Sequence, residues 1–291
     1  MDKKAKQELL IEYKQETINK NKSLISKYEH DYKNNSLIDC DLSKDDIYLE
    51  FCETKEQKQK WLAYVHMTTS LPYKGAVGRQ IKIFVKCNDH ILGMIHLTSP
   101  LAQMKVRDKY LNLENKWEDL KKIYNIETCV PTRKYANFLT GKLMIYVLYS
   151  NVVYEYIKSK YGDYPIGFET TSLYGKSSIY NRIPFFKYLG LTEGMSAVYI
   201  KDEEWKKILE EYYKVYPNTK TNRLAPVKFQ IVDKLSSYYK KNKIDFPFEY
   251  KSEQFQRGVY FGYKFDCVLN EAVDNWRKRW YNKRKESIDN G

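Results

Sequence analysis

Residues 164–194 read YPIGFETTSLYGKSSIYNRIPFFKYLGLTEG, and this stretch holds the clearest structural signals in the chain. The apolar run 166–168 ends in a glutamate and two threonines (169–171), which predicts a strand that stops at polar side chains. A polar, glycine-containing loop follows at 173–178, then an aromatic segment that we expect to be helical, and then a strand at 195–200. A strand that ends in a carboxylate and hydroxyls can hold these groups rigidly at a sheet edge, so we expect a pocket there.

The sequence upstream of this stretch adds the elements of an α+β fold. Residues 81–97 predict a β-hairpin around a polar Asn-Asp turn, and 127–130 predict a short strand. The apolar periodicity of 137–160 predicts the best helix in the chain, and Thr54-x-x-Gln57 has the spacing of a capping box before another helix. We therefore predict a mixed sheet with a long central helix.

The outer segments are charged and helical. Residues 5–30 predict a charged helix broken near 19–21, followed by a polar linker. Further charged helices are expected near the C-terminus, and the last of them, at 267–285, is strongly basic. The expected parts are a charged N-terminal helix and linker at 1–45, an α/β core at 46–200, and a helical, basic C-terminal module at 201–291.

Composition narrows the class of protein. The chain has 291 residues, is 43% hydrophobic and 15% aromatic, and carries a formal net charge of +13, which points weakly to a polyanionic partner. Its five cysteines are scattered without a CxxC pair, so a disulfide framework and a zinc finger are not expected. The N-terminus lacks an apolar signal core, and the longest apolar region, 143–156, is too short to span a bilayer. We expect a cytoplasmic protein with no membrane partner.

The order hairpin, strand, long helix, strand, helix, strand is similar to that of the GNAT acyltransferase fold. In that fold the loop before the long helix receives the pyrophosphate of acyl-CoA at helix N-terminal amides. Thr132, Arg133 and Lys134 occupy this position and are the expected contacts to a cofactor phosphate or to nucleic acid. The usual Gln/Arg-x-x-Gly-x-Gly/Ala loop is absent, which weighs against ordinary CoA binding. Gly141-Lys142 lacks the rest of a P-loop.

Several motifs resemble, in order and spacing, the DruA-type domain known from Druantia anti-phage systems and from transposase fusions. The resemblance covers roughly residues 75–195. Its motifs are Gly78–Lys82, the hairpin with Leu92-Gly93, Arg107–Tyr110, Thr132–Tyr135, Glu169-Thr170, Ser178-x-Tyr180 and Leu189-Gly190-x-Thr192-x-Gly194.

This resemblance implies a DNA-binding protein associated with phage or mobile elements, with defence-system proteins as further partners. One interpretation is a GNAT-like transferase that modifies a DNA base with an acyl-CoA-type donor, similar in architecture to the phage Mu Mom protein. A second is a non-catalytic factor that binds nucleic acid or protein in phage defence or counter-defence. A third, a small-molecule N-acyltransferase, is weakened by the missing phosphate loop.

Glu169, Ser178 and Tyr180 are the expected catalytic residues. A solvent-facing Glu169 could act as general base or bind a substrate amine, whereas the alternative is a salt bridge or a helix cap. The hydroxyls of Ser178 and Tyr180 could donate hydrogen bonds or protons to a leaving group, whereas the alternative is packing and a helix N-cap at Ser177 or Ser178. Tyr174, Tyr180 and Phe186 are available to line a pocket for a flipped base.

The strongest electrostatic signal lies in residues 276–285, where cations alternate with aromatic rings. Cations there could neutralise phosphates while Trp276 and Trp280 stack on bases; alternatively, the two rings dock the helix and the cations face water. The expected nucleic-acid contacts are Lys176, Arg277, Lys278, Arg279, Lys283 and Arg284. Histidines at 66, 90 and 96 are too sparse for a metal site, and none is expected.

Overall fold

The chain folds into two compact units, which we call unit 1 (1–190 and 258–291) and unit 2 (191–257). The computed structural model describes residues 3–35, 40–73, 75–76, 78–173, 175–177, 179–193, 195–219 and 227–290. Contacts therefore group the chain differently from the three sequence segments 1–45, 46–200 and 201–291, because the last 34 residues rejoin unit 1.

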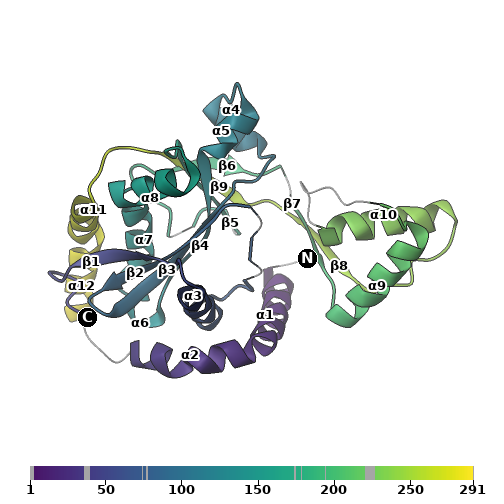
Figure 1. Ribbon diagram of the computed structural model, residues 1–291, viewed down its shortest axis with the longest axis horizontal. Coiled ribbons are helices and arrows are strands. Elements are labelled where there is room, and N and C mark those ends of the chain that lie inside the picture. Colours follow the sequence, from purple (N-terminus) through teal and green to yellow (C-terminus); the bar gives the residue numbers. More distant parts are fainter. Residues whose placement is uncertain are drawn as a thin grey trace. The chain divides into compact units, whose positions relative to one another are not determined.

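A seven-stranded mixed sheet forms the centre of unit 1, in the order β1-β2-β3-β4-β5-β9-β6 (Figure 1). Its strands are β1 (Ile47–Phe51), β2 (Gln80–Cys87), β3 (His90–Thr98), β4 (Ile123–Pro131), β5 (Gly167–Ser172), β6 (Lys187–Leu191) and β9 (Gly258–Tyr263). The pairs from β1 to β4 are antiparallel, β4 and β5 are parallel, and β5 and β9 are antiparallel. The predicted α+β class with a mixed sheet is confirmed.

Helices cover both faces of this sheet. Alternate residues of its strands point to opposite sides, and apolar side chains on both sides are buried against helices. Phe84 and Met94 face the helix α3 (Lys55–Thr68), where they pack with Trp61. Ile83 and its alternating neighbours face the other side and pack on the apolar helix α7 (Thr140–Leu148). Each residue of β3 is consequently buried.

The local signals of the N-terminal half are confirmed. The first helices are α1 (Lys3–Lys20) and α2 (Lys22–Asn35), which meet at the expected break. The side chain of Thr54 accepts a hydrogen bond from the Gln57 amide and completes the predicted capping box of α3. The predicted hairpin is β2–β3, and two short helices follow, α4 (Lys105–Leu111) and α5 (Lys116–Lys121).

The single long helix predicted over 137–160 is wrong, because that segment forms two helices, α7 and α8 (Asn151–Tyr161). A short helix, α6 (Arg133–Ala136), precedes it. Ser150 interrupts the apolar pattern with an extended backbone, and its hydroxyl donates to the Val147 carbonyl at 2.7 Å. Serine offers the backbone this alternative to the helical ladder, so the chain turns between α7 and α8.

The predicted helix before Gly194 is also wrong. Residues 187–191 form the strand β6, which lies beside β9 in the sheet. Phe186 is buried at its start and stacks on Tyr260 of β9, with 5.8 Å between the ring centroids. Contact with a strand that comes 70 residues later in the chain outweighs the local pattern.

Unit 2 pairs two helices with a two-stranded sheet. It contains β7 (Met195–Tyr199), α9 (Asp202–Val215), α10 (Val227–Lys241) and β8 (Lys251–Phe255), with β7 antiparallel to β8. The strand at 195–200 and both helices agree with the sequence prediction. Ile208, Tyr212 and Leu235 form the centre of its own apolar cluster.

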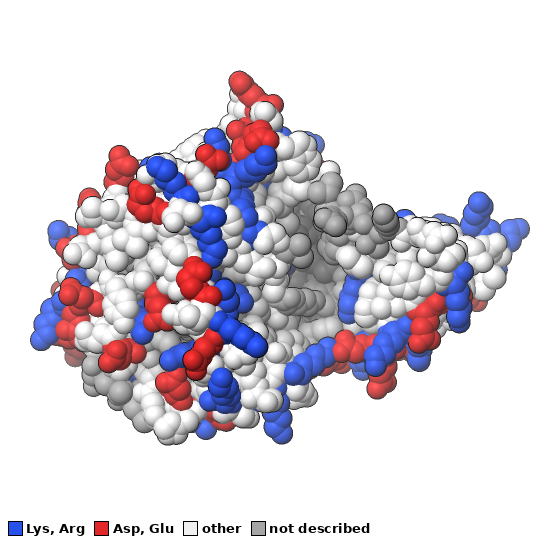
Figure 2. Space-filling model, in the orientation of Figure 1, with Lys and Arg blue, Asp and Glu red and all other residues white. Residues whose placement is uncertain are grey.

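The chain ends in a helical segment on unit 1, as predicted. It comprises α11 (Leu269–Trp276), the π-helix η1 (Arg277–Tyr281) and α12 (Asn282–Asp289). Among the helices that the structure describes, none combines the length and apolar character needed to cross a bilayer. Cations and carboxylates are interspersed over the face of unit 1 seen in Figure 2, so the positive excess is not gathered on that face.

Candidate nucleic-acid interface

Two tryptophans fix the C-terminal helical segment to unit 1. Trp276 is fully buried, and its indole N–H donates to the Leu139 carbonyl at 3.2 Å. Trp280 is 9% exposed, and its indole N–H donates to the Tyr146 hydroxyl at 3.3 Å. Buried indoles with satisfied N–H groups act as anchors. The two rings therefore dock the helix onto the rest of unit 1, which is the second of the two alternatives, and they are not available to stack on bases.

The π-helix brings the anchors into register. The amide of Asn282 donates to the Arg277 carbonyl five residues earlier, which widens the turn by one residue. Trp276 and Tyr281 consequently share a face, with 5.3 Å between their ring centroids, while Trp280 is buried beside them. The residues between the anchors, Lys278 and Arg279, are left exposed.

Five basic residues of this segment are expected nucleic-acid contacts, and they divide by what their side chains contact. Arg277 donates to the carbonyls of Leu42 at 2.9 Å and Asp45 at 2.6 Å. Arg284 donates to the Asn137 carbonyl at 3.0 Å, so both arginines bind the helix to unit 1. The side chains of Lys278 and Lys283 are exposed and are the better placed of the five to meet phosphates.

Three cations surround the Trp280 ring, and we call them the Trp280 cluster. Lys142, Arg279 and Arg182 lie 4.1, 5.5 and 5.7 Å from a ring centroid of Trp280. Burial lowers the pKa of Lys142 to about 8, and the charges of Arg182 and Arg279 add to the shift. The lowered pKa therefore reflects burial first and the two neighbouring positive charges second, and a nearby anion would oppose the effect of those charges.

The backbone contributes to this geometry. Arg182 has a φ of 62°, in the left-handed region that non-glycine residues rarely adopt. Its carbonyl accepts a hydrogen bond from Arg279 at 3.2 Å, while Lys142 donates to the neighbouring Asn181 carbonyl at 2.7 Å. The turn at 181–182 is therefore held by two members of the cluster.

A cavity of about 340 Å³ opens beside the exposed cations, and we call it the aromatic pocket. Tyr146, Phe185 and Phe265 supply its rings; Phe185 lies 5.0 Å from Tyr146 and 4.9 Å from Phe265, centroid to centroid. The remaining lining residues are Pro184, Cys267, Ala272, Asn275, Lys278 and Arg279. An apolar cavity with a few polar groups at its margin is the usual form of a ligand site.

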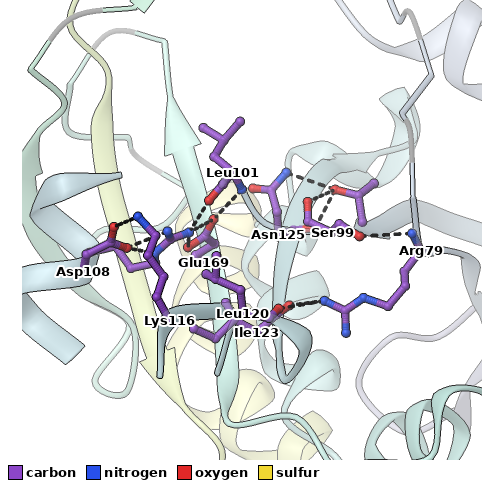
Figure 3. A network of polar contacts seen from close by, with 11 residues as sticks. Arg79, Ser99, Leu101, Asp108, Lys116, Leu120, Ile123, Asn125 and Glu169 are labelled. Atoms are coloured by element: carbon purple, nitrogen blue, oxygen red, sulfur yellow. Dashed lines mark hydrogen bonds and ion pairs between the residues drawn. The ribbon is translucent and has the colours of Figure 1, made fainter. Parts of the chain in front are cut away.

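Glu169 lies elsewhere and is not solvent-facing, which corrects the sequence expectation. It is fully buried in β5, and Arg107 Nη1 donates to its two carboxylate oxygens at 3.1 and 2.9 Å. Figure 3 shows Glu169 within a network that also includes Leu101, Asp108 and Lys116. Burial raises the pKa of the Glu169 carboxyl, and the charge and hydrogen bonds of Arg107 oppose that rise.

The rest of the network satisfies Arg107. Its guanidinium donates to Asp108 Oδ1 at 2.6 and 2.8 Å and to the Leu101 carbonyl at 2.8 Å. Lys116 reaches Asp108 Oδ2 at 2.6 Å from the start of α5. Hydrogen bonds from Lys116 and Arg107 lower the Asp108 pKa against the opposing effect of burial. The network thus ties α4 and α5 to β5.

Tyr180, another expected catalytic residue, does not form an accessible centre with Glu169. Tyr180 is 9% exposed and packs between Phe186 and Tyr260; burial raises the pKa of its hydroxyl. Ser178 and Tyr174 lie outside the described residues. Lys176 is exposed, with its ammonium 5.3 Å from the Tyr188 ring centroid.

The loop before α7 offers less to an anion than expected. The Thr132 hydroxyl is buried and donates to the Ile91 carbonyl at 2.9 Å, Arg133 is exposed, and the Lys134 ammonium lies 5.8 Å from the Tyr135 ring centroid. The first turn of α7 is buried, and Trp276 covers the Leu139 carbonyl that precedes it. Within the described residues no group of three His, Cys, Asp or Glu side chains is arranged to hold a metal ion.

The sequence alone does not identify the residues that complete the pocket and the cluster. Lys142 belongs to an incomplete P-loop pattern, and the local pattern around Phe185 predicts a helix. Arg182 and Phe265 carry no local signal, since their role depends on the C-terminal segment returning to α7. The alternation of cations and aromatic rings at 276–285 is the sequence signal that indicates this site.

Comparison with protein-family models places the chain beside a known family. A family model described as Druantia protein DruA matches residues 2–235. The match extends well beyond the motifs at 75–195 and ends within α10, before β9 and the C-terminal helical segment. No curated protein matches the chain.

Proposed function

The chain belongs to the DruA family, and from this premise we propose that it is the component of a Druantia anti-phage system that holds nucleic acid on its C-terminal helical segment. Membership of the family implies a defence-system component, with other Druantia proteins as partners. Nucleic-acid binding is the finer statement, and it rests on the geometry of unit 1.

The observation that carries the proposal concerns residues 276–284. Some of them bind the segment to the rest of unit 1, while others are exposed cations. Trp276, Trp280 and Arg277 use their hydrogen-bonding groups within the protein, so the segment is rigid. Lys278 and Lys283 remain exposed on that rigid support, and Lys278 directly precedes Arg279 of the Trp280 cluster. Fixed cations bind a phosphate backbone at a smaller entropic cost than cations on a mobile tail.

A group-transferase function is less well supported by the same structure. The expected base, Glu169, is engaged by Arg107 in a buried pair, and Tyr180 is packed among aromatic rings. The expected phosphate loop precedes a buried helix start. These features favour the binding function over base modification with an acyl-CoA-type donor.

The test is the salt dependence of binding to a short DNA duplex. Replacing both Lys278 and Lys283 by glutamine should make the slope of log affinity against log salt shallower by up to about 1.8, since each lost phosphate contact removes about 0.9. Affinity should fall equally for all sequences, because phosphate contacts carry no base information.

Lys207 and Lys214 on α9 provide the matched control. Their side chains are 66% and 72% exposed, and changing both to glutamine removes the same charge from unit 2. This control should keep the wild-type slope. Identical slopes for the two double variants would contradict the proposal.

A further inference from the structure

Resting on the proposed nucleic-acid function, we propose that the aromatic pocket receives one unpaired base, so that the protein prefers single-stranded nucleic acid to duplex. Phosphate contacts alone would not favour a single strand over a duplex, because both forms present a phosphate backbone. The pocket supplies a feature that a duplex, with its bases stacked inside, cannot use.

The size of the pocket fits one nucleotide. Its volume of about 340 Å³ lies at the lower end of the range for small-molecule sites. A single base with part of its sugar is of that order, whereas a base pair needs a larger volume. The occupant is therefore a base that has left its stack or was never paired.

The walls have the chemistry that an unpaired base requires. Phe185 stands between Tyr146 and Phe265, and Phe265 is 37% exposed at the margin. An accessible ring offers a stacking surface that every base can use. The amide of Asn275, which is exposed on α11 and lines the same pocket, can donate to and accept from a base edge.

Charge complementarity indicates a nucleotide as the occupant, in preference to an apolar side chain. Lys278 and Arg279 line the pocket, and Arg279 also belongs to the Trp280 cluster. A base entering the pocket would bring its own phosphates to these cations. An uncharged aromatic side chain of a partner protein would leave them without a counter-charge.

The pocket also differs from the one expected from sequence. Tyr180 and Phe186 were expected to clasp a flipped base, but both are buried in the core of unit 1. Tyr146, Phe185 and Phe265 line the cavity instead, because the turn at 181–184 and the segment before α11 converge there.

The experiment compares a ten-residue oligothymidylate, an abasic backbone of the same length, and a duplex, at one salt concentration. For the wild-type protein we expect the oligothymidylate to bind about tenfold more tightly than the abasic strand, the effect of one stacked base. It should also bind more tightly than the duplex. Asn275→Trp fills the pocket from an exposed helix position and should abolish the difference between oligothymidylate and abasic strand.

Asn270→Trp places the same ring at another exposed position of α11, outside the pocket lining, and should retain the wild-type preference. Equal binding of all three probes, with the Lys278- and Lys283-dependent salt slope intact, would overturn the pocket inference and leave the proposed function standing. Loss of that slope as well would overturn both. A preference for oligothymidylate that survives in Asn275→Trp would also overturn the inference. A phenylalanine-terminated peptide serves as a fourth probe. If Asn275→Trp weakened the binding of this peptide alone, the pocket would be assigned to a protein partner instead.

Discussion

Single residues that identified the family act in this structure as ties between loops and the sheet. Arg107 joins α4 to Glu169 of β5. Arg79 donates to the carbonyls of Leu120 and Ile123 at 2.9 and 2.8 Å. Thr132 bonds the carbonyl of Ile91 across the sheet. These residue types are needed because each satisfies buried polar groups far away in the chain.

Glu169 should therefore matter to stability. Glu169→Gln keeps the shape but removes one of the two carboxylates that pair with Arg107, the other being Asp108. The guanidinium then loses hydrogen bonds to a charged acceptor, and such a bond contributes about 1.5–3 kcal/mol. We expect the free energy of unfolding in urea to fall by about that amount. This replaces the sequence expectation of a solvent-facing side chain whose loss leaves stability nearly unchanged.

Glu118→Gln is the matched control. Glu118 pairs with Lys121 on α5, but its side chain is 58% exposed. Exposed pairs contribute less than about 1 kcal/mol, so this variant should unfold close to wild type. Equal stabilities of the two variants would show that the buried pair does not hold α4 and α5 to the sheet.

Elements were predictable where their signals are local. The β2–β3 hairpin, the capping box of α3 and the break between α1 and α2 follow from residues within a few positions of one another. The strand β6 was not predictable in this way, because it is formed by contact with β9, which comes after unit 2. Glu169 shows the same limit at the site, since its partner Arg107 lies 62 residues away.

The terminal helical segment makes a prediction at the scale of one element. Arg277→Gln should lower the melting temperature, because it removes charged hydrogen bonds to the carbonyls of Leu42 and Asp45, each worth about 1.5–3 kcal/mol. The salt slope of DNA binding should not change in this variant, since Arg277 is engaged within the protein.

Lys278→Gln, one residue further, should behave in the opposite way. It should leave the melting temperature unchanged and make the salt slope shallower. Thermal scans and binding titrations on both variants check this pair. A stable Arg277→Gln protein with a shallower salt slope would mean that Arg277, and not its neighbour, meets phosphate.

At the scale of the whole molecule, the first and last residues of unit 2 lie side by side. The Thr192 amide donates to the Arg257 carbonyl at 2.9 Å, and the Arg257 amide donates to the Thr192 hydroxyl at 2.9 Å. On either side lie β6 and β9, which are neighbours in the sheet of unit 1. Unit 2 is thus inserted between two adjacent strands.

Replacing 193–256 by an Asn-Gly turn should leave a cooperatively folding unit 1, because that dipeptide suits a two-residue hairpin. Circular dichroism during urea unfolding checks the fold. Since the proposed interface belongs to unit 1, DNA affinity and its salt slope should persist. Loss of binding in a folded deletion variant would place the interface on unit 2.

The most direct test of the nucleic-acid interface is to map where a bound strand touches the protein. An oligothymidylate carrying one photoreactive 4-thiothymidine would be crosslinked to the full chain, and the modified peptides identified by mass spectrometry. We predict crosslinks at Phe185, Phe265 or Tyr146 and within 267–285, and their loss in Asn275→Trp. Crosslinks confined to Thr132–Lys134 or to unit 2 would contradict the interface proposed here.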